Sequence, residues 1–299
     1  MFARPLLASL IALALLPAPA QAQDAADMAE LLRQRLAERL KDKPDAKPEA
    51  KADTKAATPK AAPKKKPEGA ANGTAHWGYT GEGAPERWAE LSPEFRTCAT
   101  GTRQSPIDIR EGIRVDLEKI DFAYRPSRFS VLDNGHTIQV NVAPGNTLGV
   151  MGRRFELQQF HFHKPSEERI NGKLFDMVAH LVHRDAEGKL AVVAVLLERG
   201  SAQPLVQTIW NNLPLEKGED LPAPGNIDLN QLLPEDRAYF TYMGSLTTPP
   251  CSEGVLWMVM RQPVQISNDQ LNIFGRLYPM NARPLQAGSG RLIKESLGP

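Results

Sequence analysis

The sequence predicts a mostly β fold with a few short helices, preceded by a long N-terminal region without a core of its own. In residues 73–299, short strand-like runs dominate, turn signals separate them, and helical periodicity is scarce. The strand-like runs are Thr137–Val142, Phe155–His163, Met177–His183, Leu190–Leu197 and Gly254–Met260. The turn signals include Asn134-Gly135, Pro144-Gly145-Asn146 and Asn171-Gly172. The best helical pattern is Ala202–Asn212.

Composition excludes several classes of protein. The 299-residue chain is nearly neutral, with 36 Lys and Arg against 35 Asp and Glu. A protein that binds nucleic acid through bulk charge needs a clear basic excess, so we expect no nucleic-acid partner. The chain has two cysteines, which excludes a cysteine-rich scaffold and a four-cysteine zinc finger.

Residues 1–22 are typical of a secretory signal peptide. Arg4 gives a positive start, residues 6–16 form an uncharged apolar run, and Ala20-Gln21-Ala22 is a small-x-small cleavage site. We expect cleavage after Ala22, with Ala20 as the alternative. A membrane anchor is the competing interpretation, but the run is shorter than the ~20 residues that a spanning helix needs. The prediction is a periplasmic or secreted protein with no membrane span.

Residues 23–40 predict a short amphipathic helix, because Met28, Leu32, Leu36 and Leu40 repeat every four residues. The segment is either a solvated helix or a self-association element. Two heptads are too few to support the second interpretation.

Residues 41–72 predict a disordered linker rich in Lys, Pro and Ala. Between Lys41 and Glu68 there are nine Lys, five acidic residues and five prolines, with no apolar periodicity. Such a segment buries too little apolar surface to offset its ordering entropy. Weak attachment to anionic envelope components, or self-association through residues 23–72, is an alternative role.

The histidines form a pattern typical of a metal site. In the strand-like run 159–163, alternation places His161 and His163 on one face and two phenylalanines on the other, toward a core. The Asn171-Gly172 turn that follows would reverse the chain direction, so that His180 on the next strand can lie beside His161 and His163. His183 stands at an odd offset from His180 and is therefore excluded from the cluster.

Three neutral imidazoles suit Zn²⁺ and leave its fourth position open, which is the mark of a catalytic rather than a structural zinc. The alternative for each histidine is an ordinary surface or hydrogen-bonded residue. The pattern favours one zinc ion per chain, bound by His161, His163 and His180.

Eight short motifs follow one another along residues 75–293. They are His76-Trp77-Gly78-Tyr79, Gln104-Ser105-Pro106-Ile107-Asp108, Asp133-Asn134-Gly135-His136, Gln159–His163, Pro165-Ser166-Glu167, Ala179–His183, Gly244–Pro250 and Asn281-Ala282-Arg283-Pro284. With this combination the sequence resembles the alpha-class carbonic anhydrases, in their bacterial secreted branch. The resemblance implies a large twisted, mainly antiparallel sheet of about ten strands with short peripheral helices.

The resemblance also implies an activity: the zinc-dependent, reversible hydration of CO2 to bicarbonate and a proton, by attack of zinc-bound hydroxide. In this lyase, Thr247 would accept a hydrogen bond from the hydroxide and donate one to Glu167, which orients the nucleophile. The alternative for Thr247 is an ordinary turn threonine before two prolines. An apolar pocket for CO2 would be lined by Val182, Val192, Leu246 and Trp257.

His136 corresponds to the family's proton shuttle, since an imidazole with a pKa of about 6.5 can carry the proton released in each turnover. An exposed hairpin histidine is the alternative. The waters of the shuttle path would be held by Tyr79, Asn134, Gln139 and Thr248.

Two positions depart from the family's pattern. Val178 replaces the usual Glu that accepts from the third zinc histidine, and Glu168 replaces a usual His. Because the family's side chains at these positions touch, we expect Glu168 to accept from the His180 imidazole. Gln159 is the second residue expected to support the ligands. The alternative is that support of His180 is lost, which typically lowers metal affinity or activity roughly 10–100-fold.

Cys98 and Cys251 are expected to form one disulfide in an exported protein, with two free buried thiols as the alternative. Two further functions compete with the enzyme assignment. One is a carbonic-anhydrase-like binding protein without catalysis, although its relatives of that kind lose zinc histidines. The other is a zinc ester hydrolase.

Overall fold

The computed structural model describes residues 76–110 and 112–297. The expected signal peptide (1–22), amphipathic helix (23–40) and linker (41–72) lie outside the described residues. The strands are β1 (Asp108–Ile109), β2 (Ile113–Val115), β3 (Asp121–Ala123), β4 (Phe129–Asp133), β5 (Ile138–Val142), β6 (Thr147–Val150), β7 (Arg153–His163), β8 (Arg169–Ile170), β9 (Lys173–Leu174), β10 (Met177–Arg184), β11 (Leu190–Arg199), β12 (Asp220–Pro222), β13 (Tyr239–Ser245), β14 (Glu253–Met260), β15 (Val264–Ile266) and β16 (Lys294–Ser296). The helices are α2 (Trp88–Leu91), α3 (Thr97–Thr100), α4 (Pro204–Trp210) and α5 (Asn268–Leu277), with 3-10 turns η1 (Gly81–Gly83), η2 (Pro85–Arg87), η3 (Pro93–Phe95) and η4 (Leu229–Leu232).

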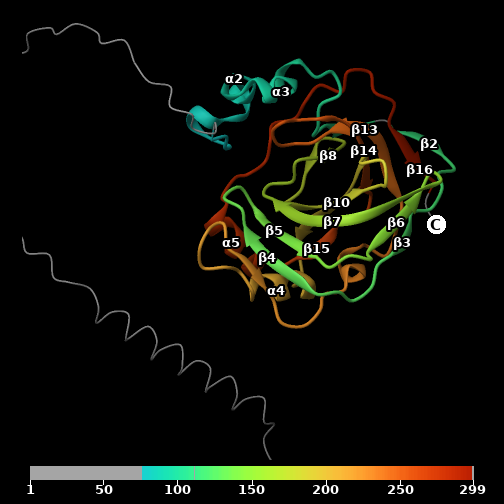
Figure 1. Ribbon diagram of the computed structural model, residues 1–299. Coiled ribbons are helices and arrows are strands. Elements are labelled where there is room, and N and C mark those ends of the chain that lie inside the picture. The colour runs from blue at the N-terminus through green and yellow to red at the C-terminus, as the bar shows by residue number, and fades with distance from the viewer. Residues whose placement is uncertain (1–75, 111, 298–299) are drawn as a thin grey trace, which may run out of the picture. The chain divides into compact units, whose positions relative to one another are not determined.

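One large mixed sheet organises the domain (Figure 1). Its main path runs β12-β4-β5-β7-β10-β11-β14-β13-β16-β2, and β3, β6 and β15 pair at its sides. Most neighbours are antiparallel, whereas β11 pairs in parallel with β14 and β15, and β16 with β2. The predicted mainly antiparallel sheet of about ten strands is confirmed. A second, small sheet joins β1, β8 and β9.

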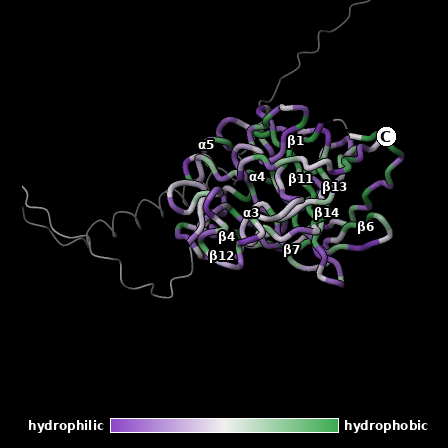
Figure 2. Tube along the Cα trace, turned by 90° about the horizontal axis from the view of Figure 1, so that it is seen from above, coloured by the Kyte–Doolittle hydropathy of each residue, from purple (hydrophilic) through white to green (hydrophobic). Residues whose placement is uncertain are grey.

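The strand sequences explain which faces are buried. In β4 and β5, buried and half-buried residues alternate, so one face packs on the core. The central strand β11 is a continuous apolar run that is buried on both faces, as expected where core lies on either side of a sheet. Two apolar clusters result: Phe160, Phe162 and Val193 lie in one, and Val192 and Trp257 in the other. In Figure 2 the hydrophobic stretches follow inner strands, while many peripheral turns are hydrophilic.

Local pattern predicted the longer elements. All five strand-like runs are strands, and the helical pattern at 202–212 contains α4. The 10-residue helix α5 was not predicted. Its sequence signal is a capping box, in which the Ser267 hydroxyl accepts from the Gln270 N–H and the Gln270 side chain accepts from the Ser267 N–H.

Cys98 in α3 and Cys251, in the loop between β13 and β14, form the predicted disulfide. It ties the N-terminal helical segment to the loop that carries Thr247, and the alternative of two free thiols is wrong. Among the described residues, no helix is both long and apolar enough to cross a membrane.

The disulfide gives a direct test in solution. We expect the native protein to react with no equivalent of a thiol reagent, and the reduced, unfolded protein to react with two, because the chain contains only Cys98 and Cys251. Thiol titration before and after reduction measures this. Two reactive thiols in the unfolded but unreduced protein would contradict the pairing.

Candidate metal centre

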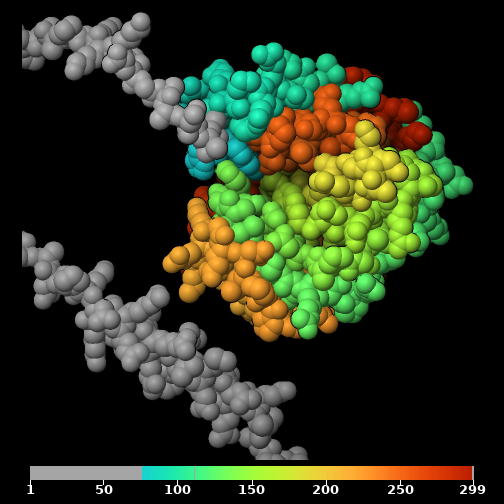
Figure 3. All heavy atoms as spheres, in the orientation of Figure 1, coloured from blue at the N-terminus to red at the C-terminus, as the bar shows by residue number. Residues whose placement is uncertain are grey.

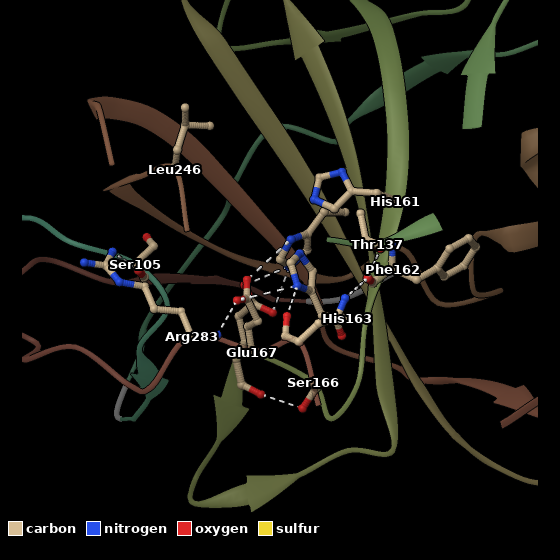
Figure 4. A network of polar contacts seen from close by, with 12 residues as sticks. Ser105, Thr137, His161, Phe162, His163, Ser166, Glu167, Leu246 and Arg283 are labelled. Carbon is tan, nitrogen blue, oxygen red and sulfur yellow. Dashed lines mark hydrogen bonds and ion pairs between the residues drawn. The ribbon is translucent and has the colours of Figure 1, made fainter. Parts of the chain in front are cut away.

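Three histidines converge on one face of the large sheet. His161 and His163 lie on β7, and His180 lies directly opposite His161 on the neighbouring strand β10. One ligand nitrogen from each ring lies within 4.8 Å of the other two. Figure 4 shows His161 and His163 projecting from the same strand, with the Glu167 carboxylate beside His163.

Each ring is held by a hydrogen bond from one of its two nitrogens. His161 Nδ1 lies 2.9 Å from Gln159 Oε1, and His163 Nδ1 lies 2.7 Å from the carbonyl oxygen of Asn281. His180 uses Nε2, which lies 3.1 and 3.2 Å from the two carboxylate oxygens of Glu168. These acceptors leave Nε2 of His161, Nε2 of His163 and Nδ1 of His180 for a metal ion.

The donor set fits a zinc ion. Nε2 of His163 is fully buried and has no hydrogen-bond partner among the described residues. A buried polar atom without a partner is costly, and a metal ion would satisfy this one. Three imidazole nitrogens are also a preferred ligand set for Zn²⁺ with one open position.

Burial keeps two of the rings neutral, as metal binding requires. It lowers the pKa of His161 to about 3, and it lowers the pKa of His163 well below the ordinary value, in each case with help from the charge of His180. Burial acts in the same direction on His180, but the Glu168 and Glu167 carboxylates outweigh it and raise the pKa of His180. The carboxylates thus increase the basicity of this ligand.

Glu167 lies beneath the histidines and is almost fully buried. Its Oε1 accepts from the backbone N–H of Arg283 at 2.7 Å, and its carboxylate lies 3.6 Å from His163 Nδ1 and 3.8 Å from His180 Nδ1. Burial raises the pKa of Glu167 to about 7 with help from the charge of Glu168, whereas the charge of His180, the nearby Thr247 hydroxyl and the Arg283 N–H oppose the rise. Thr247 therefore sits beside the carboxylate.

A hollow of about 290 Å³ opens at the histidines. It is lined by Gln158, Gln159, His161, His180, Val182, Arg184, Leu190, Val192, Leu246, Thr247, Thr248 and Trp257. The four residues expected to bind CO2 are all among them. Figure 3 shows this face, hollowed between the orange segment near residue 250 and the yellow segment near residue 190.

Of the residues expected on the proton path, Thr248 lines that hollow, whereas His136, Tyr79, Asn134 and Gln139 do not. The His136 ring stacks on Trp77, with 3.7 Å between ring centroids and 6° between planes. Asn134 accepts from the His136 backbone N–H at 3.0 Å and donates to Gln139 at 3.2 Å. Tyr79 lines a separate cavity, on whose wall Glu167 also lies. Burial lowers the pKa of His136, and the neighbouring His76 and Lys217 add to this effect.

His183 faces away from the cluster, as strand alternation predicts. Its Nε2 lies 2.7 Å from the Tyr124 hydroxyl, and its Nδ1 donates to the Leu181 carbonyl at 2.9 Å. Both nitrogens are therefore occupied, and the ring has a structural role in the core.

The hydrogen-bond acceptor of His163 could not be predicted from the sequence. The Asn281 carbonyl belongs to the backbone, and a backbone group leaves no signature in residue type. The motif Asn281-Ala282-Arg283-Pro284 was the available signal. Its Arg283 donates to Gln104 at 2.9 Å and to the Ser105 carbonyl at 2.8 Å, which holds this segment against the centre.

Comparison with known proteins agrees with this geometry. The family model described as eukaryotic-type carbonic anhydrase matches residues 83–296. A carbonic anhydrase of Neisseria gonorrhoeae is 46% identical over 230 residues, covering 76% of this chain and 90% of that protein. One of Pectobacterium carotovorum is 43% identical over 227 residues, covering 75% and 92%.

Solved structures show the same likeness. The alpha-carbonic anhydrase of Thermovibrio ammonificans, solved with the inhibitor sulfanilamide, is 42% identical with a TM-score of 0.72, over 75% of this chain and 100% of that one. That of Photobacterium profundum has a TM-score of 0.70 at 42% identity, over 74% and 100%. The chain therefore belongs to the alpha-class, or eukaryotic-type, carbonic anhydrases, and CO2 hydration is its activity.

Proposed function

We propose that this chain binds one zinc ion through His161, His163 and His180 and uses it for reversible CO2 hydration. The observation that carries the proposal is the convergence of three ring nitrogens whose partner nitrogens are already hydrogen-bonded. When bound, the zinc ion lowers the pKa of a water molecule to about 7, as is known for this enzyme class, and so supplies a nucleophile at neutral pH.

The remaining chemistry belongs to the chain's own side chains. Thr247 accepts a hydrogen bond from the nucleophile and donates one to Glu167, which fixes the direction of attack. The backbone N–H of Arg283 holds the Glu167 carboxylate in place at 2.7 Å. Val182, Val192, Leu246 and Trp257 form the apolar wall against which the uncharged CO2 rests.

His136 then carries the released proton to bulk water, with Tyr79, Asn134, Gln139 and Thr248 holding the path. Its ring is stacked on Trp77 and does not line the hollow at the histidines. We therefore infer that the ring turns between this position and one nearer the hollow. A histidine whose pKa lies somewhat below its ordinary value releases protons readily at neutral pH.

The shuttle role has its own test. His136→Ala should lower the maximal hydration rate several-fold at low buffer concentration, and small imidazole buffers should restore it, because the zinc site is untouched. Stopped-flow hydration with and without imidazole measures this, and zinc content serves as the control. An unchanged rate at low buffer would assign the proton path to another group.

The disulfide and the likeness to bacterial carbonic anhydrases suggest an extracytoplasmic protein. We propose more specifically that it is periplasmic or secreted, with residues 1–22 as the export signal and residues 23–72 as an N-terminal extension to the enzyme domain.

Deleting residues 23–72 should leave CO2 hydration unchanged, since every proposed site residue lies beyond them. The expected kcat/KM of the shortened enzyme equals that of the full mature chain. A large loss of activity at normal zinc content would contradict the separation of extension and enzyme. Comparing the two proteins by sedimentation and by binding to envelope fractions tests the extension's own role.

The experiment that tests the function as a whole is the CO2 hydration rate of the mature protein with its zinc content, before and after treatment with a chelator. Loss of hydration with the metal, and its return with added zinc, is the expected result. Bound zinc without hydration would favour a binding protein, and rapid ester cleavage without hydration would favour an esterase.

A further inference from the structure

We infer that a second cavity, beside strand β13, binds a small organic anion that carries an apolar body. The cavity measures about 470 Å³. It is lined by Thr102, Arg103, Met151, Thr241, Tyr242, Met243, Leu256, Ser289, Gly290, Arg291, Leu292 and Lys294. None of these residues lines the hollow at the histidines. The Tyr242 and Trp257 rings, stacked at 6.2 Å, lie between this cavity and His180.

The position of the cavity follows from strand pairing. β16 pairs with β13 at Phe240 and Thr241 and then ends, whereas β14 accompanies β13 as far as Ser245. Within the described part of the chain, the outer edge of β13 therefore has no partner strand beyond Thr241. The segment 289–292 passes over this edge and forms the opposite wall of the cavity.

The charges on the wall favour an anion. Arg103, Arg291 and Lys294 line the cavity, and the described residues place no carboxylate on its wall. Within residues 76–110 and 112–297, none of the three takes part in an ion pair. The nearby Glu253 offsets part of this charge, since it acts on Arg103 and Arg291. Its Oε1 accepts from the backbone N–H of Arg103 at 2.6 Å and from Gln104 at 3.0 Å. One acid against three cations leaves an excess of positive charge.

Two nitrogens of the Arg291 guanidinium are hydrogen-bonded, and the third has no partner among the described residues. Its Nε donates to the Gly288 carbonyl at 3.0 Å and its Nη2 to the Ala287 carbonyl at 2.6 Å. The guanidinium also lies over the Tyr242 ring, 5.8 Å from its centroid. The third nitrogen, Nη1, is buried and has no hydrogen-bond partner among the described residues. A bound carboxylate would accept from this nitrogen in a charge-assisted hydrogen bond.

Two further features point to the same ligand. Burial lowers the pKa of Arg291, while Tyr242 and the Glu253 carboxylate oppose the shift and the charge of Arg103 adds a smaller contribution to it. An anion beside Arg291 would stabilise this buried charge. The Thr241 side chain also lines the cavity; it is 4% exposed, and its hydroxyl has no hydrogen-bond partner in the described part of the chain.

The apolar wall determines what kind of anion fits. Met151, Met243 and Leu292 are 45%, 40% and 58% exposed, and Leu256 lies beside them. An inorganic phosphate or sulfate would leave these side chains in water. A carboxylate with an aliphatic or aromatic body would cover them while its charge meets the cations.

Calorimetric titration of the zinc-loaded enzyme with benzoate tests the inference, with the neutral benzamide as a matched ligand. Because a carboxylate can also reach the zinc ion, the hydration rate in the same solutions reports occupancy of the metal centre. We expect benzoate to bind at two sites. Arg291→Gln should weaken one of them at least tenfold and leave both hydration and its inhibition by benzoate unchanged.

Lys294→Gln provides a variant that leaves the loop intact, because the Lys294 side chain makes no hydrogen bond among the described residues. It should weaken the same site several-fold. Arg276→Gln on α5 makes a like change of charge outside the cavity and should have no effect. Benzamide should not bind at this site.

Three outcomes would overturn the inference. One is a single benzoate site that follows inhibition of hydration. Another is a second site that neither Arg291→Gln nor Lys294→Gln weakens. The third is inorganic phosphate binding there as tightly as benzoate, which would show that the apolar wall contributes nothing.

Discussion

Replacing His161, His163 or His180 by alanine is expected to remove bound zinc and CO2 hydration together, with a fall in rate of at least about a thousandfold. Bulk water has a pKa of about 15.7 and supplies almost no hydroxide at pH 7, whereas zinc brings the pKa of water close to 7. Without the third imidazole the ion is no longer held in this geometry. In the His161 and His180 variants, the buried Nε2 of His163 would again lack a partner.

Metal analysis and stopped-flow hydration on the three variants check this result together. His76→Ala is the matched control, because His76 is an exposed histidine outside the cluster. It should retain full zinc content; its rate is compared in imidazole buffer, because the His76 and His136 rings lie 5.8 Å apart. Substantial hydration in all three ligand variants would remove the histidines from the mechanism, even if their zinc content fell.

Glu168→Gln should lower zinc affinity roughly 10–100-fold, the effect typical of losing the partner of a metal-bound histidine. The structure places both carboxylate oxygens of Glu168 within 3.2 Å of His180 Nε2, and the side chain is fully buried. Glutamine keeps the shape and one acceptor but removes the negative charge. That charge raises the basicity of His180 as a ligand, so the metal should be lost to a chelator at lower concentration.

Val178 makes the prediction more specific. It is fully buried among apolar side chains, and a valine cannot accept a hydrogen bond. The pair Glu168→His and Val178→Glu restores the arrangement usual in the family. The double variant should recover much of the zinc affinity that Glu168→His alone loses. In a double-mutant cycle the two changes would then be non-additive, as expected for side chains that interact.

Zinc titration against a competing chelator, together with the hydration rate, measures both effects. Glu198→Gln on β11 makes the same chemical change away from the centre, where Glu198 pairs with Lys173 at 2.8 Å, and should leave zinc affinity unaltered. If Glu168→Gln also left affinity and rate unaltered, the carboxylate would not be supporting His180.

The strands and the cluster of three histidines could be predicted from the sequence because their signals are local. Alternation along a strand has a period of two residues, so His161 and His163 had to share a face once their segment was recognised as a strand. The same rule placed Phe160 and Phe162 in the core and turned His183 away from His180. The disulfide was equally accessible, because Cys98 and Cys251 are the two cysteines of the chain.

Other features depended on residues that are far apart in the chain. The carbonyl that holds His163 belongs to Asn281, 118 residues away, and no periodicity connects the two. The stacking of His136 on Trp77 depends on the packing of the N-terminal segment against the sheet.

The sequence by itself therefore determined the fold class, the family and the three clustered histidines, since these depend on residue type and short-range spacing. The tertiary structure decided how Glu168 meets His180, which backbone carbonyl holds His163, and how Arg103, Arg291 and Lys294 come together around a cavity. These arrangements arise when distant strands pair and loops close over their edges, and that pairing is a property of the whole chain rather than of any local pattern.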